Sequence, residues 1–582
     1  MVISKDILKK ILVDPGYIKE ADFEEVTAGI IKSESFLNDV IHFLVAKKLI
    51  PEEQLGSIIA TALGYPFVDL KKTDISSEIL NIIPEEVARS KRVISFDVAG
   101  NIVKIATLDP NNPDLLKYLQ EKIRRRTESS YTTSLNIEEK KIEYQIEFYY
   151  TTPANIQHAL NFYRKSLYEQ IKNLIQDLQK NPKNEENIVL LINLFLEYAY
   201  NERASDIHIE PSKNHVSVRF RIDGILYEMI DYPNELHDKI VSRLKIMSRL
   251  PIDEHETALD GRFDFSVNKN FFDVRVSIMP IIGGENIVMR LLVEKSEKET
   301  LEKLGFLDAD LEKIKRASSK SYGMILAVGP TGSGKTTILY SILKKLNRPE
   351  VNIMTIEDPI EYEVDHIQQT QINPKKNITF ANGLRFIVRQ DPNIIMVGEI
   401  RDNETASIAV NAAMTGHLLL STLHANDAST AFPRLTEMNT EPFLLVSAIN
   451  LVIASRLVRK ICQECRIEYS LSEAELNILK KEENLKKIIK DIAQKDDLTK
   501  IVFYKGSGCK SCGYTGYYER TGVFEILEIS NPIRLLVIEK ASADAIQQKA
   551  LELGMTSITH DGIIKVLNGT TTLEEIIRVT RS

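Results

Sequence analysis

The segment from Gly329 to Thr336, GPTGSGKT, has the residue types and the spacing of a phosphate-binding loop. Glycine lets the backbone fold tightly enough to point several N–H groups at phosphate oxygens, and a following helix adds the positive end of its dipole. We expect the Lys335 side chain to reach the β and γ phosphates of ATP and the Thr336 hydroxyl to ligate Mg²⁺. The predicted nucleotide-binding residues are Gly329, Pro330, Thr331, Gly332, Ser333, Gly334, Lys335, Thr336 and Thr337.

Carboxylates follow two further segments that are predicted to be strands. Glu399 comes directly after the apolar run 394–397, at the edge where open α/β sheets bind ligands. It is a candidate ligand for Mg²⁺ or a candidate partner of the attacking water. The segment 355–361 offers three more carboxylates, of which Glu361 is the candidate base, because hydrolysis needs a residue that orients or deprotonates water. The alternative is that these acids cap helices and solvate loops.

Two histidines, His417 and His424, stand at opposite ends of a short apolar segment that is predicted to be a strand. This placement suits a pair that senses whether the γ-phosphate is present. A single histidine is more often structural, so the alternative is that each one only stabilises the fold.

The four cysteines of the chain form two C-x2-C pairs, Cys462 with Cys465 and Cys509 with Cys512. Four thiolates suit a closed tetrahedral Zn²⁺ site, which leaves no open position for catalysis. The 43 residues between the pairs exceed the usual spacing, but a helical stretch rich in lysine and glutamate can be looped out between them. The alternative is two unrelated pairs of buried thiols.

The elements that must position these groups can be predicted from periodicity. The apolar strand 324–328 runs directly into the phosphate-binding loop, which is the order of an α/β nucleotide-binding core. From Asn187 onward the apolar residues recur at helical steps, and the segments 216–222 and 272–278 alternate so that their arginines face away from the apolar side chains. A helix is predicted around 37–49, a short strand at 65–70, and a buried helix at 443–454, a stretch too short to span a membrane.

Length and charge limit the class of protein. A chain of 582 residues is too long for one hydrophobic core, and its net charge of -8 argues against nucleic acid as a partner. The start of the chain lacks the pattern of a secretory signal, so a cytoplasmic location is expected. The predicted regions are 1–165, a polar linker at 166–185, 186–297 and 298–582, the last with a zinc subdomain at 456–520 and helices at 530–582.

These motifs, in this order, resemble the type II secretion and type IV pilus assembly ATPase family. The resemblance rests on the following segments: Ala204–Pro211 and Arg219–Gly224, Glu357–Glu361 as an aspartate box, Gly398–Asp402 as a Walker B motif, Thr415–His424 as a histidine box, the tetracysteine segment, Thr515–Tyr517 and Gly554–Met555. It covers most of the chain.

The resemblance implies a multidomain α/β protein. It would have a RecA-like phosphate-loop core, a preceding PAS-like α+β lobe and an N-terminal α+β domain for regulation or partner docking. It also implies a hexamer that hydrolyses ATP between two lobes and acts on an inner-membrane platform protein and a cytoplasmic-ring adaptor. Arg219, Arg221, Arg275 and Arg290 are then candidates to neutralise phosphate charge, although arginines on an exposed strand face are more often solvated.

One departure from the family concerns a second nucleotide. Some relatives bind cyclic di-GMP through an Arg-Leu-Gly motif, whereas the comparable helix here contains Phe36-Leu37-Asn38, so that ligand is not predicted. The alternatives for function are a retraction motor of the same superfamily, a zinc-containing binding module that uses nucleotide as a switch, and a nucleic-acid translocase. The sequence does not separate pilus assembly from type II secretion.

Overall fold

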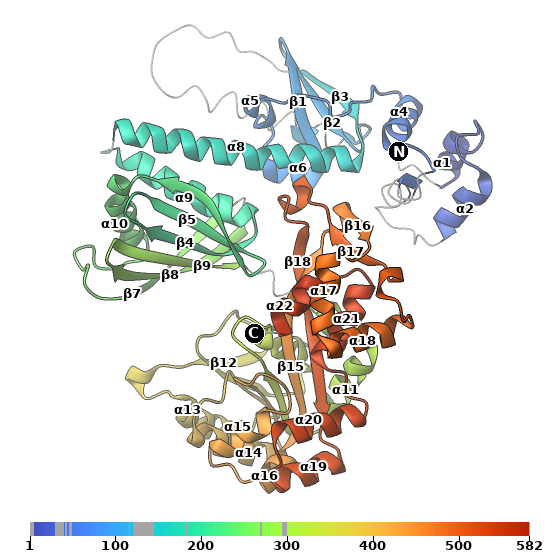
Figure 1. The fold of residues 1–582 in the computed structure, drawn as a ribbon. Helices are drawn as coiled ribbons and strands as arrows, with labels where there is room; N and C mark the ends of the chain where they lie inside the picture. The colour runs from blue at the N-terminus through green and yellow to red at the C-terminus, as the bar shows by residue number, and fades with distance from the viewer. Residues whose placement is uncertain are drawn as a thin grey trace.

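Three regions follow one another along the chain in the computed structural model (Figure 1). The structure describes residues 5–28, 40, 44–45, 49–113, 115, 117–119, 145–181, 184–267, 270–293 and 300–580. Most of the predicted helix 37–49 lies outside these residues.

The first region combines helices with a three-stranded sheet in the order β1-β2-β3. β1 and β2 pair antiparallel, whereas β2 and β3 pair parallel. Its elements are α1 (Lys5–Leu12), α2 (Glu20–Ala28), α4 (Glu52–Leu63), α5 (Ser77–Leu80), α6 (Glu85–Lys91), β1 (Val93–Ala99), β2 (Ile102–Thr107) and β3 (Gln145–Tyr150).

The strand predicted at 65–70 is wrong, because the segment forms only one isolated parallel bridge, between Phe67 and Tyr150. The bridge consists of hydrogen bonds from Val68 N to the Tyr150 carbonyl and from Tyr150 N to the Pro66 carbonyl, at 3.0 and 2.9 Å. The ladder does not extend because Pro66 has no N–H to donate and because the chain turns at Asp69.

The predicted linker 166–185 is helical as far as Lys180, since it forms the second half of α8 (Pro153–Lys180). Ile156 and Leu160 at the start of α8 pack into the first region. Leu167, Ile171 and Leu178 pack into the second. These apolar residues recur at helical steps within a polar composition, so one helix packs into both regions.

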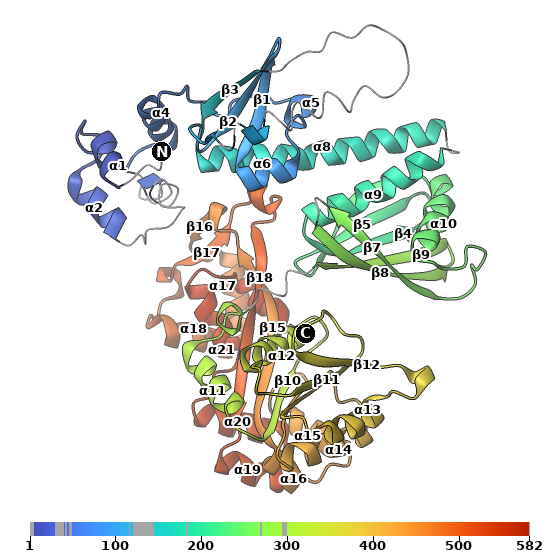
Figure 2. The ribbon, with the colours of Figure 1, turned by 180° about the vertical axis from the view of Figure 1, so that it is seen from behind.

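The second region is a six-stranded antiparallel sheet in the order β6-β5-β4-β9-β8-β7. Figure 2 shows α9 and α10 against this sheet. In β5, Val216, Val218 and Phe220 are buried, whereas Arg219 and Arg221 lie on the other face, as predicted. The elements are α9 (Glu185–Asn201), β4 (Ala204–Pro211), β5 (Val216–Ile222), β6 (Ile225–Tyr232), α10 (His237–Met247), β7 (Leu259–Val267), β8 (Asn270–Ile281) and β9 (Gly284–Val293).

The third region is built on a seven-stranded sheet in the order β12-β11-β13-β14-β10-β15-β18. Its strands are parallel except for β18, which pairs antiparallel with β15. Separate hydrophobic clusters cover the two faces. The strands are β10 (Gly323–Val328), β11 (Ile353–Glu357), β12 (Ile367–Gln371), β13 (Ile394–Val397), β14 (Leu418–Leu423), β15 (Ile449–Ile461) and β18 (Tyr517–Glu528). The helices are α11 (Asp308–Ser318), α12 (Lys335–Leu346), α13 (Phe380–Ile387), α14 (Asn403–Met414), α15 (Ala431–Glu437) and α16 (Pro442–Ala448).

The helix predicted at 443–454 is half wrong, because α16 ends at Ala448 and β15 begins at Ile449. This part of β15 is buried between β10 and β18. A mainly apolar run therefore fits a buried strand as well as a helix, and Ile449, Val452 and Ile453 are β-branched. Among the described residues, no helix combines the length and the apolar character that a membrane span requires.

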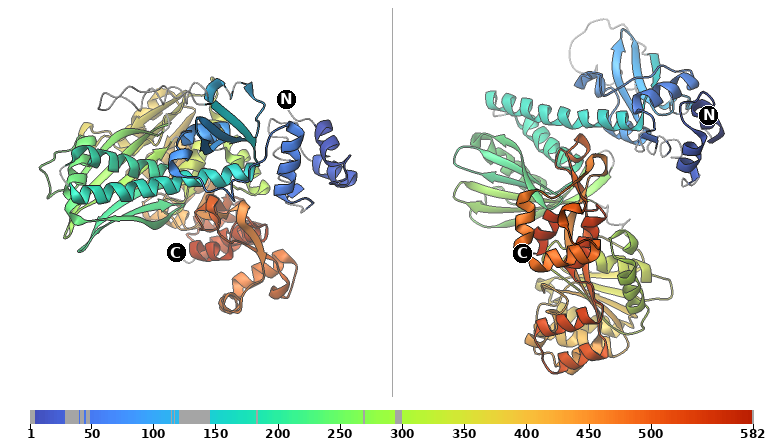
Figure 3. Two further views of the ribbon diagram at one scale, coloured as in Figure 1. Left: turned by 90° about the horizontal axis from the view of Figure 1, so that it is seen from above. Right: turned by 45° about the vertical axis from the view of Figure 1, so that its right-hand side comes forward.

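The cysteine pairs lie where β15 leaves the sheet and where the chain returns into β18. The lysine- and glutamate-rich stretch between them forms helices, as predicted. The elements are β16 (Arg466–Tyr469), α17 (Glu473–Lys481), α18 (Glu483–Ala493) and β17 (Phe503–Gly506), followed after β18 by α19 (Asn531–Ile538), α20 (Ala543–Glu552), α21 (Ile558–Leu567) and α22 (Leu573–Thr580). Figure 3 shows the inserted elements projecting to one side of the third region.

Candidate active site

The phosphate-binding loop connects β10 to α12 at the carboxyl edge of the seven-stranded sheet. Gly329, Gly332 and Gly334 have φ angles of 146°, 77° and 90°, a region that favours glycine. At Gly329 a β-carbon would lie 2.5 Å from Ser333 Oγ and 2.7 Å from the Ser455 carbonyl oxygen. The loop is therefore closed against β15, and its first position has room only for glycine.

Lys335 is the first residue of α12 and is buried. Its Nζ donates hydrogen bonds to the carbonyls of Gly329 and Pro330, at 2.9 and 3.0 Å. Burial lowers the pKa of Lys335, an effect that the Glu399 carboxylate opposes. The ammonium thus lies inside the loop, where a phosphate anion would offset the cost of burying its charge.

Glu399 and His424 meet beside this loop, at the ends of β13 and β14. The Glu399 carboxylate is buried and pairs with Arg401 Nη2 at 2.5 Å and with His424 Nε2 at 3.4 Å. The two strand ends are held together by Thr422, whose Oγ1 donates to the Gly398 carbonyl at 2.7 Å. A buried carboxylate and an exposed imidazole are therefore presented together at the edge of the sheet.

His417 lies at the opposite edge of the sheet. Its Nδ1 is 2.9 Å from the Ala412 carbonyl oxygen, and its own carbonyl accepts a hydrogen bond from Gly323 N, at the start of β10. A strand rises roughly 3.3 Å per residue, so β14 separates the two histidines by about 20 Å. Within one chain, the structure therefore places His424 beside Glu399 and does not bring His417 to the same edge of the sheet.

The carboxylates after β11 have two different environments. Glu357 is buried and accepts hydrogen bonds from Tyr340 Oη and Thr355 Oγ1, both at 2.5 Å. Burial raises its pKa, and its contacts join α12 to the sheet. Glu361, the candidate base, is exposed, and its carboxylate lies 3.6 Å from Arg275 Nη1. Only Glu361 of the two is accessible to water.

Of the four candidate arginines, Arg275 reaches the third region, where its Nη2 also donates to the Ile360 carbonyl at 3.1 Å. The other three pair with carboxylates of the second region. Arg219 lies 2.6 Å from Glu210, and Arg221 and Arg290 lie 3.6 and 3.0 Å from Asp206. The structure thus brings Arg275 to Glu361 and leaves Arg219, Arg221 and Arg290 on the face of their own sheet.

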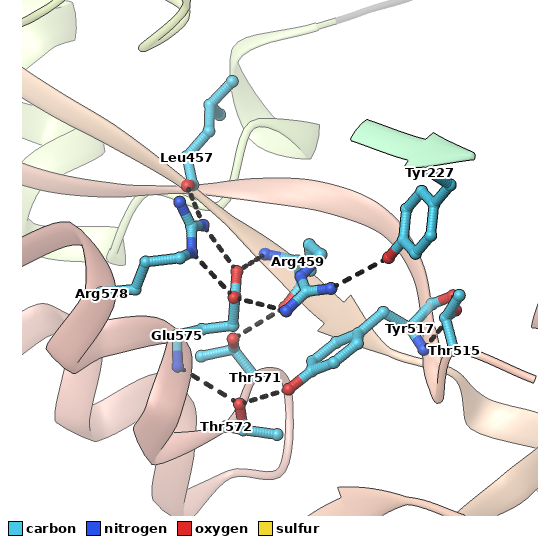
Figure 4. Close-up of polar contacts among 9 residues, drawn as sticks. All are labelled: Tyr227, Leu457, Arg459, Thr515, Tyr517, Thr571, Thr572, Glu575 and Arg578. Carbon is cyan, nitrogen blue, oxygen red and sulfur yellow. Dashed lines mark hydrogen bonds and ion pairs between the residues drawn. The ribbon is translucent and has the colours of Figure 1, made fainter. Parts of the chain in front are cut away.

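A further contact between the second and third regions forms around Arg459 of β15 (Figure 4). The sequence did not indicate this contact. Its Nη1 donates to the Tyr227 hydroxyl of β6 at 3.4 Å, and its guanidinium lies 3.9 Å from the centre of the Tyr517 ring. Glu575 of α22 accepts from its backbone N and its Nη2, at 2.8 and 2.9 Å. The end of β15 is therefore linked to the second region and to the last helix.

Two residues of β15 that were not predicted, Ser455 and Leu457, lie against the phosphate-binding loop, and Arg456 stands between them. Ser455 Oγ donates to Ser333 Oγ at 3.3 Å, and the Leu457 side chain lies 3.6 Å from where a β-carbon of Gly334 would be. Arg456 points the other way and donates to the Asn426 carbonyl at 2.8 Å. The alternation of these residues was present in the sequence, but interpreting the preceding apolar run as a helix hid it.

The four cysteine sulfurs form one cluster, in which all lie within 4.8 Å of one another. The Sγ–Sγ distances are 3.7 Å for Cys462 to Cys509, 3.9 Å for Cys465 to Cys512 and 3.7 Å for Cys509 to Cys512. A tetrahedral site with Zn–S bonds of about 2.3 Å requires S–S distances of about 3.8 Å. The cluster therefore has the dimensions of a structural zinc site.

Comparison with known proteins agrees with this geometry. Residues 181–578 match the family described as Type II/IV secretion system protein, and residues 63–145 match the MshEN domain. The type IV pilus assembly ATPase PilB of Myxococcus xanthus is 38% identical over 92% of both chains. The type II secretion system protein E of Dickeya dadantii is 44% identical over 69% of this chain and 77% of its own.

Among solved structures, the pilus retraction motor PilT with bound ADP is similar at 25% identity, with a TM-score of 0.44 and coverage of 67% of this chain and 97% of that one. The family match covers more than half of the chain and contains the phosphate-binding loop, Glu399, His424 and the cysteine cluster. The chain therefore belongs to the Type II/IV secretion system protein family and is an ATP hydrolase.

Proposed function

We propose that the chain is the motor that assembles a type IV pilus, acting as a homo-hexamer in the cytoplasm at the inner membrane. The observation that carries the catalytic part is the closed phosphate-binding loop with Glu399 and His424 at the same sheet edge. The match to PilB extends over 92% of this chain and so includes most of the first region, whereas the match to the Dickeya secretion protein covers 69%. This difference favours pilus assembly.

The loop N–H groups and Lys335 would bind the phosphates of ATP. The Thr336 hydroxyl and the Glu399 carboxylate are oxygen donors of the kind that Mg²⁺ prefers, and the ion would neutralise charge on the phosphate oxygens. Glu361 and Glu399 are the candidates to orient the attacking water. Arg275 would bring positive charge from the second region of the same chain.

The remaining assignments follow the family. We infer a RecA-like core, a PAS-like second region and a structural Zn²⁺ in the four-cysteine cluster. Arg219, Arg221 and Arg290 remain candidates to contact the phosphates of a neighbouring subunit in the hexamer. The partners would be an inner-membrane platform protein and a cytoplasmic-ring adaptor.

Type II secretion is the second candidate, because the identity to the Dickeya protein over the shared motor is 44%. Deletion of the gene in its source organism separates the candidates. Loss of surface pili with normal protein secretion supports the proposal, and loss of secretion with intact pili supports the second candidate. An excess of pili would instead identify a retraction motor. Native mass spectrometry with Mg²⁺ and a slowly hydrolysed ATP analogue tests the hexamer.

A further inference from the structure

The loop that follows β14, residues 424–430, has a buried base and an exposed start. Ala428 and Ser429 are fully buried, whereas the side chain of His424 is 52% exposed and lies beside Glu399. Thr430 closes the base by donating from its N and Oγ1 to Asp427 Oδ1, at 2.7 and 2.6 Å. The position of the His424 imidazole therefore depends on what holds this loop.

Arg456 of β15 holds the loop from one side through the Asn426 carbonyl, two residues after His424. Successive residues of a strand point to opposite faces, and the preceding residue, Ser455, contacts the phosphate-binding loop. β15 therefore lies between the two loops, with one residue turned toward each of them.

Glu525 of β18 holds the loop from the other side. Its carboxylate accepts hydrogen bonds from Ala428 N at 3.1 Å and from Gln547 Nε2 of α20 at 2.9 Å. Ser429 Oγ completes the set by donating to Gln547 Oε1 at 2.6 Å. Glu525 is paired with Ala454 in the ladder between β15 and β18, so it is a diagonal neighbour of Arg456 on the same sheet face.

Glu525 is 2% exposed, and burial raises its pKa. A carboxyl group in this position costs stability that an apolar side chain would not cost. The Glu525 carboxylate fixes two polar groups of the loop. It binds the Ala428 N–H directly and the Ser429 hydroxyl through Gln547.

We propose that Glu525 is a positioning residue for ATP hydrolysis. Together with Gln547, it fixes the buried base of loop 424–430 and so holds the His424 imidazole against Glu399. The inference rests on the proposed function, with His424 contributing to hydrolysis beside Glu399.

The hydrogen-bond pattern defines the conservative variant. In Glu525→Gln, the new amide oxygen can accept from Ala428 N while its NH₂ donates to a flipped Gln547, whose own NH₂ then donates to Ser429. In Glu525→Ala, both acceptor positions are lost. The glutamine variant should therefore recover most of the activity that the alanine variant loses.

The test is a double-mutant cycle of Glu525→Ala and His424→Ala, measured as ATP hydrolysis by the full chain. Glu525→Ala alone should lower kcat by about tenfold or more, with KM and the Kd of a fluorescent ATP analogue unchanged within about twofold. In the His424→Ala background, the same change should lower kcat by no more than about twofold. Glu528→Ala, an exposed carboxylate on the same strand, is the matched control.

The outcomes distinguish failure of the positioning role of Glu525 from failure of the role of His424 in hydrolysis. Wild-type kcat in Glu525→Ala, or an undiminished loss in the His424→Ala background, overturns the positioning role and leaves the role of His424 intact. Wild-type kcat in His424→Ala overturns both. Should Glu525→Ala not fold, Gln547→Leu replaces it in the cycle under the same criteria. From a partly exposed helix position, it removes the hydrogen bonds of Gln547 to Glu525 and to Ser429, and so frees one side of the loop base.

Discussion

Glu575 of α22 is the residue whose replacement should destabilise the third region most clearly. It is fully buried and accepts two hydrogen bonds from Arg459, as shown in Figure 4, and two from Arg578, at 2.9 and 2.7 Å. Glu575→Ala removes all four and leaves the Arg459 guanidinium, whose side chain is 13% exposed, without its carboxylate.

The size of the effect follows from burial. Removing one partner of a buried ion pair costs about 3 to 5 kcal/mol. Arg578 is 42% exposed and can turn toward water, so the lower figure applies. With a shift of roughly 2 to 4 °C per kcal/mol for a region of this size, about 3 kcal/mol corresponds to a Tm lower by roughly 6 to 12 °C.

The measurement is differential scanning calorimetry of the full chain, with Glu528→Ala as the control. Glu528 pairs with Arg316 on the surface, and an exposed pair contributes about 1 kcal/mol or less. A Glu575→Ala transition no lower than that of Glu528→Ala would show that the buried network does not stabilise the region, and would refute the reasoning.

Wild type and Glu575→Ala should also differ in how their Tm depends on pH. Burial raises the pKa of Glu575, but hydrogen bonds from Arg578 and Arg459 outweigh burial and hold the pKa below its usual value. A group whose pKa is lowered by folding contributes stability above its unfolded value, about 4.3 for glutamate, and loses it as the pH falls through the folded value. The difference in Tm between wild type and Glu575→Ala should therefore be full at pH 7 and shrink below about pH 4.

At the phosphate-binding loop, Lys335→Ala should abolish binding of a fluorescent ATP analogue, whereas Glu399→Gln should bind it and lower kcat by about 100-fold or more; wild-type turnover in Glu399→Gln would remove that residue from the site. At the cysteine cluster, elemental analysis should find about one zinc per chain, and Cys509→Ser should lose it and unfold at lower temperature. A metal-free chain with an unchanged Tm would contradict this. At the contact between the second and third regions, Arg275→Ala and Glu361→Ala should lower kcat by similar factors, and the double variant should lose little more than either single variant. A loss in the double variant equal to the two single losses combined would show that the two side chains act separately.

Motifs that act through near neighbours in the chain were predictable. The phosphate-binding loop needs only a strand, glycines at three positions and a helix, and all of these lie within about 20 residues. The two cysteine pairs are each local, and the helices between them follow from periodicity. The strands 216–222, 324–328 and 394–397 were identified because alternation or an apolar run preceded a clear change of composition.

Predictions failed where local pattern left the secondary structure undecided. The run 443–454 suits a helix or a buried strand equally, and its position between β10 and β18 decides for a strand after Ala448. The polar composition of 166–185 gave no sign of a helix, whereas apolar residues at helical steps pack α8 against the second region.

Short-range spacing was enough to predict a glycine-rich turn that binds a nucleoside triphosphate and two cysteine pairs that form one four-sulfur cluster. Which distant groups lie beside that turn depends on how the strands assemble. Strand order and direction place His424 beside Glu399 and His417 about 20 Å away, and they bring Glu525 under a loop nearly one hundred residues earlier in the chain. Such contacts arise from pairing between strands far apart in sequence, so they follow from the assembled sheet.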